Sequence, residues 1–212
     1  MRTAVPRDKI TKLFCLVTLT AGAVAASLFL SPKSVADHSL TSVVLNDSSY
    51  VVLARHSDAP GQSEPDGFNL NDCSTQRNLS DKGRNDAREL GEMFRAHGIN
   101  VTKVLASRWC RAHETAELMK LGPVENVSVF DNFEFNKQHA KELLDGERKL
   151  IASWRGPGVL LVVSHASNII ALTGIHLEEG AMLVVSLKQG RLLAEPFSAS
   201  SANARLSCAG CF

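Results

Sequence analysis

The stretch Tyr-Val-Val-Leu-Ala-Arg-His-Ser-Asp, residues 50–58, constrains the fold of this chain more than any other. Its apolar half is typical of a strand that is buried on both faces of a parallel sheet. The run ends abruptly in Arg55 and His56. A cation and an imidazole therefore lie at the carboxyl end of a strand, where open α/β sheets bind ligands. We expect His56 to be a nucleophile and Arg55 to be one wall of a phosphate pocket.

The rest of the chain alternates between apolar strand patterns and amphipathic helix patterns, which predicts an α/β domain with a mainly parallel sheet. The stretch 59–77 is rich in Pro, Gly, Asp, Asn and Ser, and we expect it to be a loop that carries substrate contacts or a lid. The predicted helices cover residues 81–97, 108–121 and 137–154, with a fourth beginning at 168–172. The predicted strands cover residues 101–106, 127–130 and 159–163, followed by a hairpin of 182–187 and 191–194.

The first 36 residues differ in kind from the rest. Basic residues precede an apolar stretch over 13–30, and Ser34 and Ala36 follow at the −3 and −1 positions of a cleavage site. The segment reads as a secretory signal peptide or a retained N-terminal membrane anchor, and in both cases the following domain is exported. We therefore expect a signal or anchor over 1–36, a linker over 37–48, a catalytic domain over 49–197 and a loose tail over 198–212. The expected location is periplasmic or otherwise extracytoplasmic.

Four cysteines remain if the first segment is removed, and an even number in an exported chain favours disulfides. Cys73 and Cys110 would then pair across the fold, which their spacing permits. Cys208 and Cys211 form a Cys-x-x-Cys at the end of the chain without a strand–helix context, which favours a short local disulfide or two free thiols.

The charge balance limits the class of partner. The chain has 23 Lys and Arg against 22 Asp and Glu, a formal net charge of +1. A nucleic-acid partner normally requires a clustered basic face, and the sequence has none. We expect a small phosphorylated substrate that is held by a few local arginines, with no nucleic acid and with membrane contact only through the N-terminal segment.

Three predicted strands end in residues suited to an anion. The first ends in Arg55 and His56, the second leads through Ser107 to Arg111, and the third ends in Ser164 and His165. Because carboxyl ends of parallel strands meet at one edge of a sheet, these side chains should converge. Planar guanidinium groups match phosphate oxygens bidentately, and Arg111 would also lie in the first turn of its helix.

In these motifs the chain resembles the histidine phosphatase superfamily, also called the phosphoglycerate-mutase-like family. The matching segments are Leu-Ala-Arg-His-Ser at 53–57, Ser-Arg-Trp-Cys-Arg-Ala-His-Glu-Thr-Ala at 107–116 and Val-Ser-His at 163–165. A further likeness lies in Leu-Ser-Asp-Lys-Gly at 79–83. The resemblance spans about residues 50–187 and implies a three-layer sandwich with helices on both sides of the sheet.

The resemblance also implies residue roles. His56 would attack a phosphoryl group and become a phosphohistidine, which water then hydrolyses. Arg55, Arg111 and His165 would hold the phosphoryl oxygens, in line with a reaction that depends on positioning and electrostatic stabilisation. No metal and no other cofactor is expected, because the arginines supply the positive charge.

Two departures from the family pattern concern the neighbours of the nucleophile. The family usually has Gly where this chain has Ser57, and Ala166 follows the second histidine, so the His-Asp pair of the phytase-like branch is absent. The sequence therefore leaves three possibilities for the acid that protonates the leaving group. Glu134 lies roughly where the phosphoglycerate-mutase branch carries its acid, Asp58 is the rival, and a good leaving group needs no acid.

The sequence thus predicts an exported phosphomonoesterase acting through a phosphohistidine on His56. Analogy with exported relatives suggests envelope or lipopolysaccharide sugar phosphates as substrates. The alternative, favoured by Ser57 and the unassigned acid, is a catalytically weak phosphate-binding module with the same fold. The natural substrate and the oligomeric state are not predicted.

Overall fold

The computed structural model describes residues 50–188 and 191–197. The signal or anchor over 1–36, the linker over 37–48, the tail over 198–212 and Cys208 and Cys211 lie outside the described residues. Within the described part of the chain, no helix is both long and apolar enough to cross a membrane.

The centre of the fold is a six-stranded sheet in the order β3-β2-β4-β1-β5-β6. The first four strands in this order run parallel to one another. Strand β5 is antiparallel to β1, and β6 is antiparallel to β5, so that β5 and β6 form the predicted terminal hairpin. The sheet is therefore mainly parallel, as expected. The strands are β1 Tyr50–Arg55, β2 Val101–Ala106, β3 Val124–Asn126, β4 Val159–Ser164, β5 Met182–Lys188 and β6 Arg191–Phe197.

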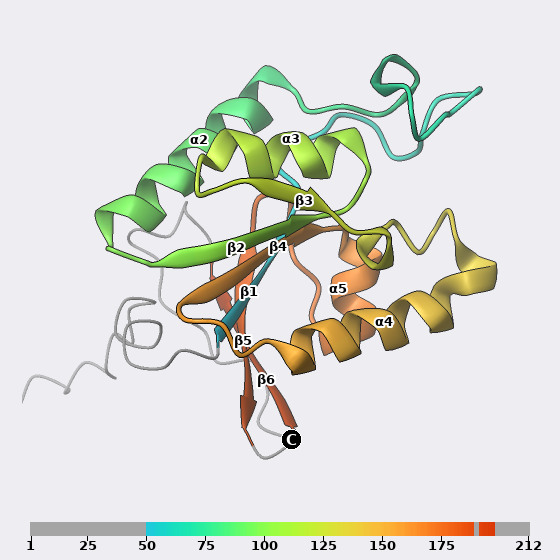
Figure 1. Ribbon diagram of the computed structural model, residues 1–212. Helices are drawn as coiled ribbons and strands as arrows, with labels where there is room; N and C mark the ends of the chain where they lie inside the picture. Colours follow the sequence, from blue (N-terminus) through green and yellow to red (C-terminus); the bar gives the residue numbers. More distant parts are fainter. Residues whose placement is uncertain (1–49, 189–190, 198–212) are drawn as a thin grey trace, which may run out of the picture. The chain divides into compact units, whose positions relative to one another are not determined.

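Helices cover both faces of the sheet, which confirms the three-layer sandwich. Figure 1 shows α2 and α3 on one face and α4 and α5 on the other. The α-helices are α2 Asp81–Ala96, α3 Cys110–Met119, α4 Ala140–Ser153 and α5 Ala166–Thr173. Three short 3-10 helices accompany them: η1 Cys73–Thr75, η2 Ser128–Phe130 and η3 Lys137–His139.

Strand β1 supplies both cores, because successive side chains of a strand point to opposite faces. Val52 and Ala54 pack into the core under α2 and α3, whereas Val51 and Leu53 pack into the core on the α4 and α5 side. Burial on both faces explains why β1 reads as a continuous apolar run rather than as an alternating one.

The close approach of α2 to α3 depends on Gly91. A Cβ atom at this position would lie 2.0 Å from the carbonyl oxygen of Met119, so any larger residue would push the two helices apart. Helix α2 begins where predicted, with Ser80 as the N-cap whose hydroxyl accepts the N–H of Gly83 at 2.9 Å.

The predicted strand over 127–130 is wrong. Strand β3 lies earlier, with Val124 paired to Val104. The Val127 N–H makes a last hydrogen bond to the Ala106 carbonyl of β2, and the chain then leaves the sheet. Residues 128–130 then form η2, and Phe130 is buried against the second core. The apolar residues Val127, Val129 and Phe130 all pack against this core. The run 127–130 is too short for its period to distinguish a strand from a turn.

The starts of three helices also differ from expectation, and α5 begins at Ala166 rather than at 168. Helix α4 begins at Ala140 because η3 occupies residues 137–139. Helix α3 begins at Cys110 rather than at 108, with Trp109 as its N-cap. The Ser107 hydroxyl accepts the Trp109 N–H at 3.2 Å and also contacts Nε2 of His165 at 2.9 Å.

Candidate active site

The sheet brings the two strand-terminal histidines together. Strands β1 and β4 are neighbours with Arg55 paired to Ser164, and the His56 N–H donates to the Ser164 carbonyl at 3.0 Å. The ladder thus continues one residue beyond the strands. The imidazole rings of His56 and His165 lie edge to face, with centroids 5.5 Å apart. Both rings are buried.

His56 has one ring nitrogen engaged and one aimed into the site. Its Nδ1 lies 2.9 Å from the carbonyl oxygen of Ser57, and a carbonyl only accepts, so Nδ1 carries the proton. The lone pair is then on Nε2. Burial, followed by the charge of Arg111, lowers the pKa of His56 well below its ordinary 6.5. The ring is therefore neutral at neutral pH and keeps the lone pair on Nε2.

His165 is held by Ser107 and Arg111. Its Nδ1 lies 3.4 Å from Nη2 of Arg111, which only donates, so the proton is on Nε2 and points to the Ser107 hydroxyl at 2.9 Å. Burial and the charge of Arg111 lower the pKa of His165 as well. His165 therefore enters the site as a neutral ring with a fixed tautomer.

Arg111 is the most deeply buried cation of the site. It is the second residue of α3 and its side chain is 1% exposed. Its Nη1 donates to Oε1 of Glu64 at 2.5 Å, and the Glu64 side chain is only 2% exposed. Burial lowers the pKa of Arg111 to about 10, so the guanidinium stays charged at neutral pH.

Arg55 makes its contacts with the segment between α5 and β5. Its Nη1 donates to the Leu177 carbonyl and its Nη2 to Oε1 of Glu179, both at 3.0 Å. The second oxygen of Glu179 accepts the Ala59 N–H at 3.1 Å. Glu179 thus ties the Arg55 guanidinium to the loop that follows His56.

Arg77 is a site residue that the sequence did not reveal. Its Nη2 lies 3.5 Å from Nε2 of His56, and its Nη1 lies 3.4 Å from Oε1 of Glu179. It is the last residue of the polar loop over 59–77. The loop composition predicted substrate contacts, but no spacing signal distinguished Arg77, Glu64 or Glu179 from other charged residues.

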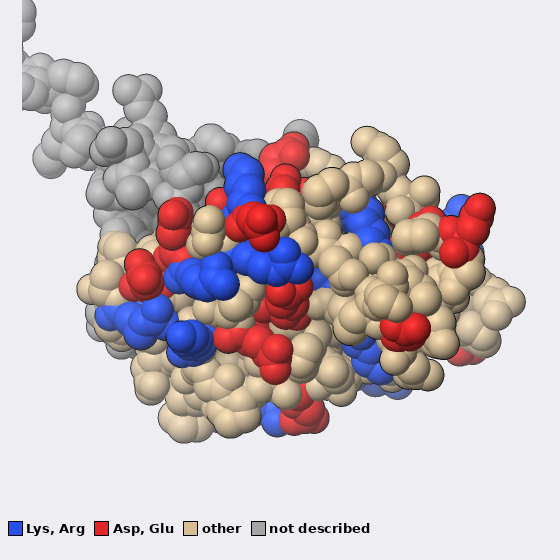
Figure 2. All heavy atoms as spheres, turned by 90° about the horizontal axis from the view of Figure 1, so that it is seen from above, with Lys and Arg blue, Asp and Glu red and all other residues tan. Residues whose placement is uncertain are grey.

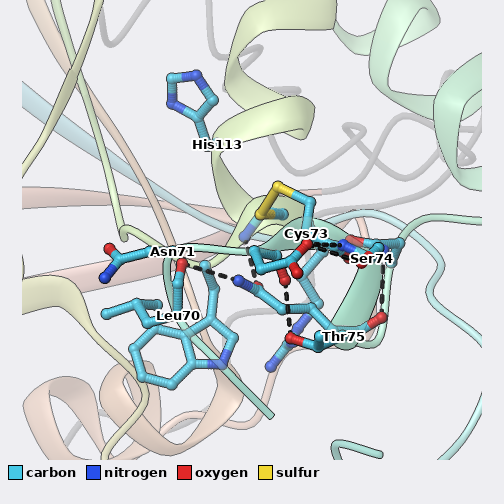
Figure 3. Close-up of a disulfide and its surroundings, with 12 residues drawn as sticks. Leu70, Asn71, Cys73, Ser74, Thr75 and His113 are labelled. Carbon is cyan, nitrogen blue, oxygen red and sulfur yellow. Dashed lines mark hydrogen bonds between the residues drawn. A yellow bond between two sulfur atoms is a disulfide. The ribbon is translucent and has the colours of Figure 1, made fainter.

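The loop is fixed to the start of α3, where Arg111 lies. The predicted disulfide between Cys73 and Cys110 is confirmed, with the two Cα atoms 5.7 Å apart. Figure 3 shows the disulfide together with the hydrogen-bonded turn around Ser74 and Thr75. Next to it, Oε1 of Gln76 accepts the Cys110 N–H at 3.0 Å. The disulfide and this hydrogen bond together hold residues 76–77 next to residues 110–111.

The charges and unused donors of this arrangement suit a single phosphoryl group. Three guanidinium groups, from Arg55, Arg77 and Arg111, face two carboxylates, which leaves one net positive charge. Among the described residues, the buried Nε atoms of Arg55 and Arg111 and the Ser57 hydroxyl have no hydrogen-bond partner. Buried donors without partners are rare in proteins, so three in one site favour an anionic ligand.

The two candidate acids lie in different environments. The Asp58 carboxylate accepts the hydroxyl of Ser80, the N-cap of α2, which gives it a structural task. Glu134 is exposed, and its backbone N–H donates to Asn132 at 2.9 Å. Within residues 50–185, neither carboxylate has a hydrogen bond or ion pair with Arg55, Arg111 or the two histidines. Glu134 as proton donor stays a prediction.

The surface around the site carries no overall excess of basic side chains, as expected if the positive charge is confined to a few arginines in the site. Figure 2 shows basic and acidic side chains interspersed on the face above α2 and α3, with no basic stripe. In the part of the chain that the structure describes, no group of three His, Cys, Asp or Glu residues could hold a metal ion.

Residues 51–137 match the family model of the histidine phosphatase superfamily (branch 1). No curated protein matches the chain by sequence.

Solved structures match the fold over nearly their whole length. The product of the open reading frame Rv3214 from Mycobacterium tuberculosis is 14% identical, with a TM-score of 0.56 over 70% of this chain and 96% of that one. The protein histidine phosphatase SixA, complexed with tungstate, is 16% identical, with a TM-score of 0.50 over 71% and 97%. A mycobacterial glucosyl-3-phosphoglycerate phosphatase with inorganic phosphate is 14% identical, with a TM-score of 0.52 over 73% and 100%.

At such low identity these structures show the fold, while the matched residues 51–137 include His56, Arg77 and Arg111. Residues 51–137 of this chain therefore match the histidine phosphatase superfamily, and the described residues share the fold of these solved structures.

Proposed function

We propose that this protein is an exported phosphomonoesterase that works through a covalent phosphohistidine on His56. Family and fold support a phosphatase enzyme. The observation that carries the residue assignment is the state of His56: a buried neutral imidazole whose Nε2 lone pair faces Arg77 at 3.5 Å. The nucleophilic nitrogen of His56 and the guanidinium of Arg77 are then close enough to contact the same phosphoryl group.

In this proposal the reaction has two steps. Nε2 of His56 attacks phosphorus, the bond from phosphorus to the ester oxygen breaks, and the leaving alcohol takes up a proton. Water then attacks the phosphohistidine, the N–P bond breaks, and inorganic phosphate leaves. Arg55, Arg77 and Arg111 stabilise the charge on the phosphoryl oxygens in both steps, and His165 orients Arg111.

The substrate follows in part from the charge balance. One net positive charge suits one phosphoryl group, whereas a second phosphate would meet Glu64 and Glu179 without a free cation. We therefore propose small monoesters with an otherwise uncharged leaving group. Envelope or lipopolysaccharide sugar phosphates meet this description.

Export is proposed from the N-terminal pattern, and the disulfide supports it because structural disulfides persist in oxidising compartments. Fractionation of cells that produce the full chain tests this. The protein should be found outside the cytoplasm with Cys73 and Cys110 oxidised. Recovery in the cytoplasmic fraction with both thiols free would overturn it.

A catalytically weak phosphate-binding module is the second candidate. Glu64 favours it, because its carboxylate already occupies Nη1 of Arg111, and Ser57 stands where the family usually has Gly. Phosphate binding by calorimetry, without hydrolysis across a panel of monoesters, would favour the module over the enzyme.

The decisive experiment for the enzyme compares wild type with His56→Ala, using p-nitrophenyl phosphate as substrate. His56→Ala should lose turnover while still binding inorganic phosphate through the arginines. His176→Ala, which removes an exposed imidazole, is the matched control and should keep wild-type activity. Full turnover in His56→Ala would refute the mechanism.

A further inference from the structure

Three aromatic rings form a continuous wall beside the phosphate site. Phe68 stacks on Trp109 with ring centroids 5.4 Å apart and planes 21° apart. Phe135 contacts both rings, at 5.3 Å from Phe68 and 6.1 Å from Trp109. We call Phe68, Trp109 and Phe135 the aromatic shelf. Each ring comes from a different segment: the loop after β1, the junction of β2 and α3, and the loop after η2.

The inner end of the shelf touches the site itself. The Trp109 ring lies edge to face with His165, with centroids 5.6 Å apart, close to the 5.5 Å between His165 and His56. The Trp109 backbone N–H and the His165 Nε2 both bond to the Ser107 hydroxyl. The indole therefore has a fixed position next to the phosphoryl pocket.

The outer end of the shelf reaches solvent. Trp109 is buried, whereas Phe135 is 46% exposed and is one of two large apolar side chains that the described residues expose. The shelf thus extends from the buried ring of His165 to the surface. An apolar ring placed there would cover the exposed face of Phe135.

Both neighbouring loops hold their rings firmly. Gln76 donates to the carbonyl groups of Asn69 and Leu70, next to Phe68. On the other side, the buried Asp131 pairs with Arg108, and the Phe135 N–H donates to the Asn132 carbonyl at 3.2 Å. An aromatic platform fixed in this way can bind a ring with little additional loss of entropy.

We propose that the aromatic shelf is the leaving-group subsite and that it selects phosphomonoesters whose leaving group presents an apolar ring face. This rests on the proposed phosphatase function. Aromatic rings prefer stacked or edge-to-face contact with other flat apolar faces, and the shelf supplies such contact next to His165. The arginines select the phosphate and the shelf selects what is attached to it.

The test compares 2-naphthyl phosphate with phenyl phosphate, two esters with similarly acidic leaving groups that differ in ring area. In wild type, the kcat/KM for the naphthyl ester should exceed that for the phenyl ester by about tenfold, from burial and stacking of the second ring. In Phe135→Ala this preference should fall to about twofold, with most of the kcat/KM for phenyl phosphate retained.

Two further variants separate the causes. Ile170→Ala removes the other exposed large apolar side chain, at 43% exposure on α5, and should leave the preference unchanged. Phe135→Leu keeps an apolar side chain without a ring and should give an intermediate preference. Thermal melts of all variants check that each is folded.

The outcomes are distinguishable. A preference of wild-type size in Phe135→Ala, with both esters still hydrolysed, overturns the shelf and leaves the phosphatase standing. No hydrolysis of either ester by wild type contradicts the proposed function itself.

Discussion

At the residue scale, the site depends on keeping two imidazoles neutral beside three guanidinium groups. His56 and His165 are each assigned a tautomer by a partner that can only accept or only donate, namely the Ser57 carbonyl and the Arg111 guanidinium. Burial, and then the positive charge of Arg111, lowers the pKa of both rings and favours their neutral forms. The charges that would bind a phosphoryl group in the proposed mechanism thus also keep the His56 ring unprotonated.

This arrangement predicts the protonation of His56. Since its pKa is lowered, the ring should remain neutral as the pH falls through 6.5, where free histidine becomes protonated. Imidazole NMR of the folded protein, with 15N-labelled histidine and assignment through His56→Ala, measures this directly. Protonation of the His56 ring at or above pH 6.5 would contradict the geometry.

Arg77 gives a second residue-level prediction. Arg77→Lys replaces a fork of donors by a single ammonium that cannot contact both Glu179 and a phosphoryl oxygen. We expect kcat/KM to fall about 10- to 100-fold, the size of one lost charge-assisted hydrogen bond. Steady-state kinetics with p-nitrophenyl phosphate measures the change. Arg88→Lys, in which an α2 arginine bonded to Asn85 is altered, is the control and should be unaffected; an equal loss in both variants would count against Arg77.

At the element scale, strand order decides which predicted residues meet. Because β4 lies between β1 and β2, His165 emerges between His56 and Ser107, as convergence of strand ends predicted. The sequence could not reveal Arg77, Glu64 and Glu179, because their positions are set by loops. Their closeness to the histidines depends on the disulfide, on Gln76 and on the turn before β5, none of which leaves a periodic pattern.

Removal of the disulfide should affect both stability and substrate binding. A Cys73→Ser, Cys110→Ser double variant frees the loop that carries Glu64 and Arg77, and closing a loop of this length is worth up to about 4 kcal/mol of stability. We expect a lower free energy of unfolding and a raised KM for p-nitrophenyl phosphate. Urea unfolding and kinetics measure the two effects.

A reductant supplies the internal control for this variant. It should reproduce both effects in wild type and change nothing further in the double variant. Wild-type KM and stability in the double variant would show that the loop is held without the disulfide.

At the scale of the whole molecule, a buried polar group on the face opposite α2 and α3 affects stability. Glu147 of α4 is buried, its Oε1 accepts from Asn168 at 2.8 Å, and its Oε2 has no partner among the described residues. Burial raises the pKa of Glu147 to about 8, so the folded protein holds a proton there that the unfolded chain has lost. Asn168 also donates to the Asp131 carbonyl, so the same cluster supports the loop that carries Phe135.

Stability should therefore fall as the pH rises. Between the unfolded value near 4.5 and about 8, the folded state binds one more proton at Glu147 than the unfolded state, which costs about 1.4 kcal/mol per pH unit at most. Glu147→Gln keeps the bond from Asn168 and removes the ionisation. Urea unfolding at pH 5 and pH 8 should show a smaller decline in this variant, and an unchanged decline would contradict the assignment.

The central claim is that His56 becomes phosphorylated during turnover. Wild-type protein mixed with p-nitrophenyl phosphate, quenched rapidly in base to preserve phosphohistidine and digested, should give the peptide containing His56 with an added phosphoryl group. The same treatment of His56→Ala should give no phosphorylated peptide. Turnover by wild type with the phosphoryl group on another residue, or with none trapped on any residue while His56→Ala remains active, would contradict it.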